Sequence, residues 1–259
     1  SQTFNSCKGL TRADLSQSAI HTIESSSFQY CSNLSEVTLP DSLLIIKNSV
    51  FNSTGIESVI LPPQLKEIGG KAFYDCKKLN KIIFTNPTPA KLNYQRSLYD
   101  YPICFTKTDT IFVPSGCRQA YINGGYLSGS IKYIIEWHAV DLSVIGQGTC
   151  KVDAPTYIIA GDKVQLNPVA AEDWELDEIL LIDQLGNIQT IDEPYLFEMP
   201  ETNVTARVKF KEIVPSLIQE IEQPVASARA VKVIIDKRIY IMRNGILYDL
   251  NGKIAKHKQ

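Results

Sequence analysis

The sequence has no long apolar run and no strong excess of charge. None of its hydrophobic stretches approaches the roughly 18 residues that a membrane-spanning helix needs, and no leader segment with a charged start and an apolar centre is visible. Lysine plus arginine number 26 and aspartate plus glutamate 28, which gives a formal net charge of −2. This balance excludes the basic footprint of a nucleic-acid-binding protein.

Signals of catalysis and metal binding are also scarce. The three histidines, His21, His138 and His257, are scattered and have no cysteine or carboxylate at metal-ligand spacing. No phosphate loop, dinucleotide fingerprint or hydrolase motif occurs. The acidic run 172–178 has strand spacing, which indicates a solvated strand face and not a calcium loop. We therefore predict no enzyme activity, no cofactor and no metal site.

Internal repetition is what the N-terminal half has in abundance. Four copies of one pattern begin at Phe4, Phe28, Phe51 and Phe73, between 22 and 24 residues apart. Each copy places a small residue three positions after the phenylalanine, then a leucine or isoleucine, then an alternating apolar stretch. This period is typical of a leucine-rich solenoid.

One copy cannot fold by itself. Ordering about 23 residues costs roughly 1–2 kcal/mol each, whereas burying about six apolar side chains returns roughly 1.5–3 kcal/mol each. Stacked copies bury these side chains against their neighbours. The alternation in 35–39 predicts one short strand per copy, and stacked strands form a parallel sheet. We therefore expect Phe28, Phe51 and Phe73 to line up in one column.

The segments SFQYCSNLSEVTLPDSLLIIKNSVF and AFYDCKKLNKIIF resemble the BspA-like leucine-rich repeats of bacterial surface proteins, of Bacteroidetes type. The resemblance covers about residues 1–135, including a closing segment at 111–136. It implies a surface or secreted repeat protein. The third copy departs from the pattern at 51–56, because it lacks the cysteine and is one residue short, which leaves its local register open. Since the chain begins inside a degenerate copy of the repeat, we expect further coils upstream.

Three of the six cysteines, Cys7, Cys31 and Cys76, occupy the same position of their copies. We interpret this position as a column of small buried thiols. A disulfide between Cys7 and Cys31 is the alternative, because neighbouring coils lie within bridging distance. Cys104 and Cys117, in the segment after the repeats, are a second candidate pair.

Residues 85–135 are expected to cap the solenoid, with strands at 110–114 and 131–135 and a short helix at 118–122. Six of the twelve tyrosines fall between 94 and 133. They either pack the irregular cap or provide aromatic contacts. Tyr94, Tyr99 and Tyr101 are the expected exposed ones, because their loop has no apolar alternation.

The pattern changes to a period of two after Trp137. Several short alternating stretches separated by glycine turns predict a small antiparallel β-sandwich-like domain at 137–212. The segments GQGTCKVDAPTYIIAGDKVQL and FEMPETNVTARVKF resemble the internalin-B-type repeat modules of surface proteins, which implies a spacer or presentation role.

The last part of the chain reads as a linker followed by a β tail. Residues 213–229 carry two prolines and no firm periodicity. After them, alternating stretches around the turn Asn244–Gly245 predict a hairpin or meander at 230–259. This tail is loosely similar to the C-terminal segments of Bacteroidetes surface proteins. The fold class is therefore mainly β: a solenoid, a β-sandwich-like domain and a β tail.

These features predict a non-catalytic, adhesin-like interaction protein that is secreted or lies at the cell surface, associated with the outer membrane. We expect it to bind a protein or glycan of a host or neighbouring cell through the outer face of the solenoid sheet. The outward positions stack side by side and are more apolar than solvation explains. The candidate binding residues are Glu36, Thr38, Ser58, Ile60, Lys81 and Ile83. The alternative is a carbohydrate-binding component of a polysaccharide-handling system that uses the tyrosines of the cap.

Overall fold

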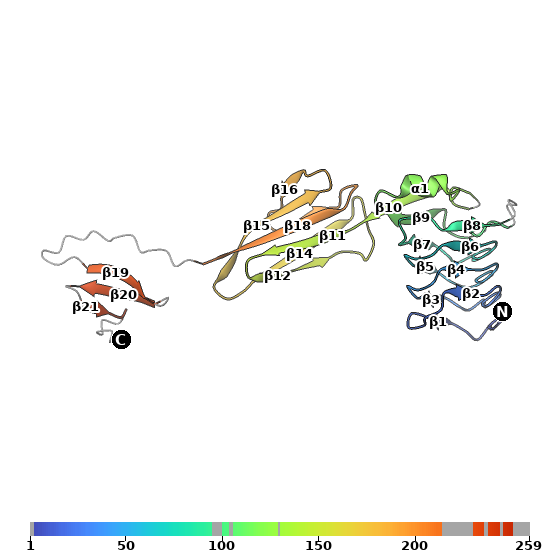
Figure 1. Cartoon of the computed structure of the whole chain (residues 1–259), viewed down its shortest axis with the longest axis horizontal. Helices are drawn as coiled ribbons and strands as arrows, with labels where there is room; N and C mark the ends of the chain where they lie inside the picture. The colour runs from blue at the N-terminus through green and yellow to red at the C-terminus, as the bar shows by residue number, and fades with distance from the viewer. Residues whose placement is uncertain are drawn as a thin grey trace. The chain divides into compact units, whose positions relative to one another are not determined.

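The computed structural model describes residues 3–94, 100–103, 106–128, 130–213, 230–235, 238–243 and 246–250. Its internal contacts divide the chain into two units, residues 1–212 and residues 213–259. The protein is mainly β, with the repeat region and the β module (residues 137–212) in the first unit (Figure 1).

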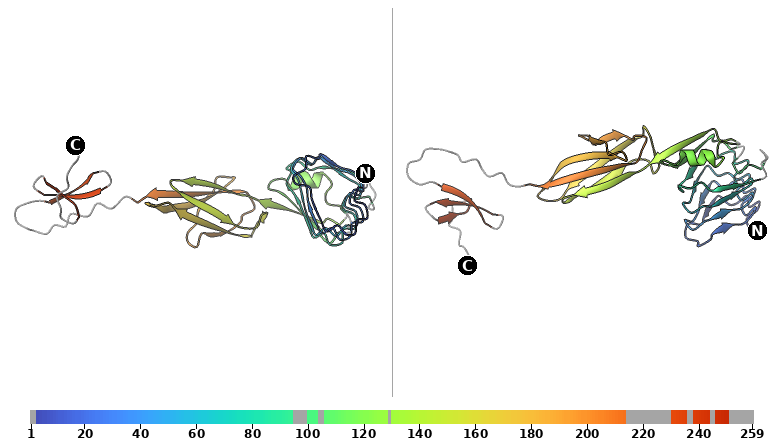
Figure 2. Two further views of the ribbon diagram at one scale, coloured as in Figure 1. Left: turned by 90° about the horizontal axis from the view of Figure 1, so that it is seen from below. Right: turned by 45° about the horizontal axis from the view of Figure 1, so that its top comes forward.

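The repeat region is a stack of coils in which each copy contributes short strands to two separate sides (Figures 1 and 2). All strands of the stack run parallel, as predicted. One side carries β1 (Arg12–Asp14), β3 (Glu36–Thr38), β5 (Ser58–Leu61), β7 (Lys81–Phe84), β9 (Thr110–Pro114) and β10 (Tyr133–His138). The second side carries β2 (Thr22–Ile23), β4 (Ile45–Ile46), β6 (Glu67–Gly69) and β8 (Lys91–Asn93).

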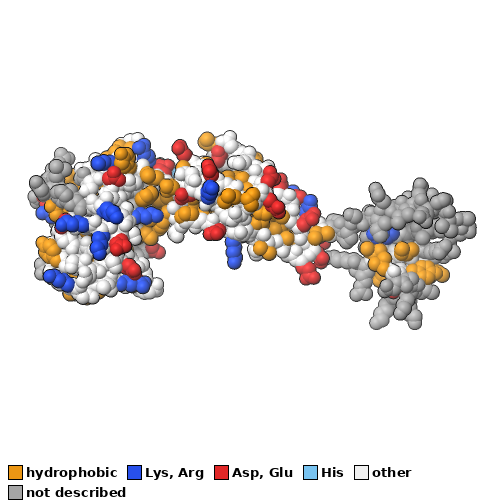
Figure 3. Space-filling view, turned by 180° about the vertical axis from the view of Figure 1, so that it is seen from behind, with side chains coloured by type: hydrophobic (Ala, Val, Ile, Leu, Met, Phe, Trp, Pro, Cys, Tyr) orange, Lys and Arg blue, Asp and Glu red, His pale blue; other side chains and the backbone are white. Residues whose placement is uncertain are grey.

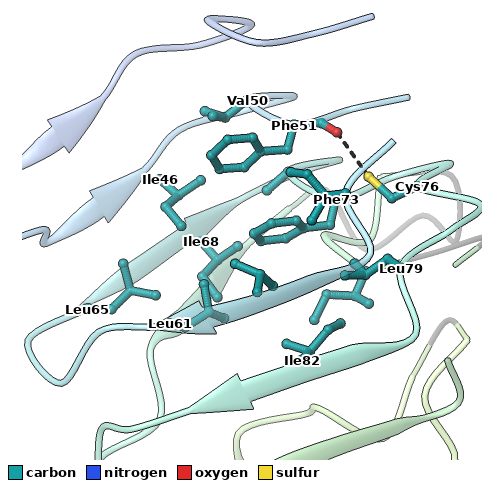
Figure 4. Packing of buried hydrophobic residues seen from close by; sticks show 14 of the residues in the cluster. Ile46, Val50, Phe51, Leu61, Leu65, Ile68, Phe73, Cys76, Leu79 and Ile82 are labelled. Carbon is teal, nitrogen blue, oxygen red and sulfur yellow. Dashed lines mark hydrogen bonds between the residues drawn. The ribbon is translucent and has the colours of Figure 1, made fainter. Parts of the chain in front are cut away.

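The phenylalanines that open the copies form one continuous column, which confirms the prediction. Ring centroids are 5.3 Å apart for Phe4 and Phe28, 5.5 Å for Phe28 and Phe51, and 5.3 Å for Phe51 and Phe73. Phe28, Phe51 and Phe73 are buried in a single core with leucines and isoleucines of the coils. Figure 4 shows Phe51 and Phe73 in this core. The shortened third copy keeps its register, because its strand β5 pairs residue by residue with β7 of the next copy and Phe73 follows Phe51 in the column.

The turn around each of these phenylalanines contains residues with left-handed backbone conformation. The residues two positions before and two positions after the phenylalanine adopt positive φ angles, which no glycine supplies here. All of these residues except Asp75 are seen to donate their N–H groups to carbonyls of the following coil, so hydrogen bonds between coils offset the strain of left-handed geometry. The residues concerned are Ser6, Ser26, Tyr30, Ser49, Ser53, Lys71 and Asp75, with φ between 55° and 60°.

The residue at the cysteine position of each copy is small, and in the second, third and fourth copies its side chain also donates a hydrogen bond. Cys31 Sγ donates to Phe4 O at 2.8 Å, and Cys76 Sγ donates to Phe51 O at 3.0 Å (Figure 4). Thr54, which replaces cysteine in the third copy, donates from Oγ1 to Phe51 O at 2.9 Å. Cys31 and Cys76 are buried, as the thiol-column interpretation predicts, but Cys7 is exposed.

No disulfide joins the cysteines that the structure describes. Cys7 and Cys31 are both free, so the alternative of a bridge between them is wrong in this structure. Cys117 is also a free thiol, and Cys104 lies outside the described residues. The structure therefore does not contain the candidate pair.

The cap closes the core with aromatic side chains. The short helix α1 (Arg118–Asn123) presents Tyr121 to the interior, where it packs against Phe84 and Tyr126. The hydroxyl groups of these tyrosines donate to buried backbone oxygens, Tyr121 to Asn86 O and Tyr126 to Ala90 O. Burial raises the pKa of both phenols above the ordinary range. The predicted packing role of the tyrosines is therefore the observed one at these positions.

The β module is a two-layer sandwich around its own core. One sheet has the order β11 (Val140–Ile145), β18 (Val204–Glu212), β15 (Trp174–Asp183), β16 (Ile188–Thr190). The other has the order β12 (Gly148–Asp153), β14 (Lys163–Ala170), β17 (Leu196–Glu198). The prediction of an antiparallel domain is wrong in one respect: β11 pairs parallel to β18. The pattern of period two could not show this, because alternation is the same in both pairings.

Strand β10 belongs to both parts of this unit. It pairs parallel to β9 of the cap, and its last two residues pair antiparallel with β13 (Ile158–Ile159) of the module. Trp137 donates from Nε1 to Phe84 O at 2.9 Å and packs edge-on against Tyr157 at 5.4 Å. The predicted boundary near residue 136 therefore falls inside a strand.

The second unit contains a three-stranded antiparallel sheet of β19 (Ala230–Ile235), β20 (Arg238–Arg243) and β21 (Ile246–Tyr248). This agrees with the predicted tail meander. The turn at 244–245, the linker residues 214–229 and the end of the tail at 251–259 lie outside the described residues.

Candidate functional site

The candidate site is the outer face of the strand stack, formed by side chains that point away from the solenoid core. These side chains form two rows, which follow from the ladder register within each of two sheets, β1–β3 and β5–β7–β9–β10, and from the contacts between β3 and β5. The first row contains Arg12, Glu36, Ser58, Lys81, Thr110 and Tyr133. The second row contains Asp14, Thr38, Ile60, Ile83, Phe112 and Ile135. Together these residues are called the outer face below.

The predicted candidates lie on this face, but they are not equally accessible. Glu36, Thr38, Ser58, Lys81 and Ile60 are exposed, and Ile60 retains 47% of its surface. Ile83 was predicted to offer contact area, yet it is 4% exposed. The expectation of an accessible Ile83 is therefore wrong. Its neighbours in the ladder, Ile60 and Phe112, are large side chains on the same face and leave it little open surface.

The cap contributes a part of the face that was not predicted from the sequence. Phe112, Tyr133 and Ile135 continue the rows beyond the four copies that open with a phenylalanine, and Tyr133 is 58% exposed. Their signal was present in the alternation of 110–114 and 131–135. It was not read as part of the face because these segments lack the repeat pattern.

Charge and apolar character separate along the face. At the N-terminal end, Arg12 lies 3.8 Å from Asp14 and 3.7 Å from Glu36 in exposed ion pairs. Toward the cap, Lys81 Nζ lies over the ring of Phe112 at 5.4 Å, a cation–π contact. Hydrophobic side chains gather where the repeat region meets the β module (Figure 3). The apolar part of the face is therefore its C-terminal half.

The tyrosines proposed for carbohydrate contacts do not form one exposed site. Tyr101, predicted to be exposed, is 1% exposed and donates its hydroxyl to the carbonyl oxygens of Gly125 and Tyr126. Tyr94 is half-buried and packs edge-on against the Tyr101 ring at 5.2 Å. Tyr99 lies outside the described residues. The prediction for Tyr101 failed because its ring is part of the hydrophobic core of the capped solenoid.

Ionisable side chains elsewhere that could serve in catalysis or metal binding are paired with neighbouring residues. His138 is buried with Nδ1 3.0 Å from Ser115 Oγ, and burial lowers its pKa. In the acidic run, Asp177 lies 2.8 Å from Lys209 and 3.2 Å from Lys211 across the sheet, and these lysines lower the pKa of its carboxyl. No cluster of potential metal ligands occurs among the residues described.

The coils and their outer face define the class as a leucine-rich-repeat solenoid. Residues 1–118 match the model of the BspA type leucine rich repeat region, in six copies. That part of the chain is therefore a BspA-type leucine-rich repeat region. A search of curated proteins found no match to the chain. Repeat regions of this type are generally non-catalytic interaction repeats, typically of surface or secreted proteins. In the described part of the chain, no helix has the length and hydrophobicity to cross a membrane.

Proposed function

We propose that this protein is a non-catalytic adhesin-like protein, secreted or held at the cell surface, that binds a protein partner through the outer face. The observation that carries the proposal is the apolar row Ile60, Phe112 and Ile135 on the solvent side of a regular sheet. Soluble surfaces keep contiguous apolar patches small unless they serve contacts. The β module, whose resemblance implies a spacer or presentation role, would present this face.

A protein partner suits the face better than a glycan does. The face is the solvent side of a sheet, and it combines aliphatic, aromatic and cationic side chains. Aromatic and large apolar anchors with a polar border are typical of protein interfaces. The carbohydrate alternative depended on the cap tyrosines, and Tyr101 is committed to core packing.

Arrays of extracellular proteins and of glycans, probed with the full chain, test the proposal. The informative variants are Ile60→Lys and Tyr133→Ala, because both side chains are exposed and removing them leaves the core intact. We expect protein spots whose signal falls at least about tenfold in these variants, since interface anchors contribute more than 1 kcal/mol each.

The matched control is Leu185→Lys, which changes an even more exposed apolar residue in a turn of the β module, 87% exposed. It should bind like the unchanged protein. Binding that survives both face variants, or signal on glycans alone, would contradict the proposal.

A further inference from the structure

Strand β11 of the β module has an open hydrogen-bonding edge. Among the strands that the structure describes, it pairs with β18 alone, and β16 occupies the opposite edge of the sheet (Figure 1). Its sequence, Val-Asp-Leu-Ser-Val-Ile, contains no proline and no lysine, and its register with β18 is unbroken. Proteins normally protect edge strands with such residues or with bulges, because free N–H and C=O groups recruit other strands. Strand β11 has none of these protections.

The same strand leaves part of the sandwich interior uncovered. Val140, Leu142 and Val144 lie beside Val204, Ala206 and Val208, so they share the inner face of the sheet. Ala206 and Val208 are fully buried, whereas Leu142 is 40% and Val144 41% exposed. The edge strand of the other sheet, β12, adds the half-buried Cys150 and Val152 beside this strip. The described chain therefore leaves an apolar seam along β11.

The orientation of the backbone decides which groups face the open edge. Ala139 O accepts a hydrogen bond from Val204 N at 3.0 Å. In a parallel ladder, alternate residues of one strand turn both backbone groups toward the neighbour. Asp141 and Ser143 therefore face β18, while Val140, Leu142 and Val144 direct their N–H and C=O groups to the free edge. Val140, Leu142 and Val144, whose backbone groups point to the free edge, are therefore also the residues whose side chains lie on the inner face of the sheet.

We propose that β11 is a self-association edge, and that its partner is β11 of a second copy, antiparallel about a twofold axis at Leu142. Leu142 then lies opposite Leu142 of the second copy, and Val140 opposite Val144. All three pairs have their backbone groups directed at each other, as hydrogen-bonded antiparallel pairs require. The apolar side chains of both copies meet on the inner face and cover the seam. Two four-stranded sheets become one continuous sheet.

Charged side chains on the solvent side of the sheet that contains β11 and β18 favour this register. Asp141 lies opposite Ser143 of the second copy, whose neighbour in β18 is the exposed Arg207. The guanidinium can extend over the small serine toward the carboxylate of the other copy. Shifting the twofold axis to Asp141 places two carboxylates opposite each other, which is destabilising. Shifting it to Ser143 leaves Val140 opposite the turn residue Gly146, whose φ of 86° ends the strand.

The pairing of one short strand is a small interface. Stable complexes bury about 1,200–2,000 Å², which five residue pairs do not reach. The dimer is therefore weak and reversible. It becomes populated at high concentration or when many copies share one surface.

Sedimentation of the full chain from about 10 µM to about 1 mM tests the proposal. We expect the average mass to rise from 28.9 kDa toward twice that value. Leu142→Lys, which introduces a standard edge protection, should remain monomeric throughout while its circular dichroism is unchanged. The matched control is Ile188→Lys on β16, the other edge of the same sheet, which should dimerise like the parent. A parent chain that stays monomeric, or a Leu142→Lys variant that still dimerises, would overturn the proposal.

Cysteine cross-linking tests the register. Residues at the twofold axis are about 5.5 Å apart between Cα atoms in a hydrogen-bonded pair, within disulfide range. Oxidation of Leu142→Cys should therefore give covalent dimers several-fold faster than oxidation of Val144→Cys, whose counterpart lies beyond bridging distance. The parent is oxidised in parallel, because Cys7 is exposed. Equal rates for the two variants would refute the twofold axis at Leu142.

Discussion

Gly55 carries the backbone of the third coil past the second coil at a distance that excludes any side chain. A Cβ atom there would lie 2.5 Å from Ser32 O, a backbone atom that cannot move aside cheaply. The third copy is the one that is short by one residue, so its chain takes a tighter path. The glycine therefore accommodates the path of the shortened copy. Thr54 beside it donates to Phe51 O of its own coil, whereas Cys31 and Cys76 donate to the phenylalanine carbonyl of the preceding coil.

Replacing Gly55 with alanine should destabilise the protein by about 1–3 kcal/mol, the usual cost of overpacking. Urea unfolding followed by circular dichroism measures the change. Gly9→Ala is the control, since nothing lies within 4 Å of its added Cβ atom. It should leave the free energy of unfolding unchanged or slightly higher. Equal effects of the two substitutions would show that the close approach is absent in solution.

The thiol of Cys76 predicts a pH dependence. Burial raises its pKa from 9.0 to about 11. The folded chain thus holds the proton more tightly than the unfolded chain, so the free energy of unfolding falls as the pH rises from about 9 to about 11. Cys76→Ser keeps a donor for Phe51 O and removes the titration. Urea midpoints at pH 8 and pH 10 should therefore decline less in the variant than in the parent, and an identical decline would refute the assignment.

At the scale of elements, the coil is stabilised by its neighbours. Phe51 stacks on Phe28 on one side and Phe73 on the other, whereas Phe4 has one stacking partner and is 43% exposed. Stability in such arrays is close to a sum of coil and interface terms. A residue inside the column contributes to two interfaces, and a residue at its end to one.

Phe51→Ala is expected to lower the free energy of unfolding by about 3–5 kcal/mol, because it removes a buried ring and leaves a cavity. Phe4→Ala should cost less than half as much, since its ring is partly hydrated and has one stacking partner. Chemical denaturation of both variants measures the difference. Comparable losses would contradict a continuous column and favour independent coils.

Across the first unit as a whole, β10 couples the repeat region to the β module. The strand extends the solenoid sheet, pairs with β13 and continues through Ala139 into β11. Trp137 closes this junction by contacting Phe84 O and Tyr157. The outer face and the module are therefore linked by backbone hydrogen bonds and not by a flexible connection.

Removing the Trp137 side chain should loosen this coupling. We expect Trp137→Ala to increase hydrogen exchange in β7, β9 and β13 several-fold, because it removes packing on both sides of the junction. Trp174→Ala provides the control, since Trp174 packs against the module core alone. It should increase exchange inside the module and leave β7 unchanged. Unchanged exchange in β13 after Trp137→Ala would show that the junction does not depend on this contact.

The sequence by itself determined the coils, their parallel strands and the phenylalanine column, because a repeat that cannot bury its own core has to stack on its copies. The short helix of the cap and the turns of the module could also be predicted from the sequence, since glycine and the alternation of apolar residues are local signals. Only the tertiary structure decided the burial of Ile83 and Tyr101, the parallel partner of β11 and the strand shared at the junction. Each of these depends on which segment far along the chain lies beside the residue, and periodicity contains no information about that neighbour.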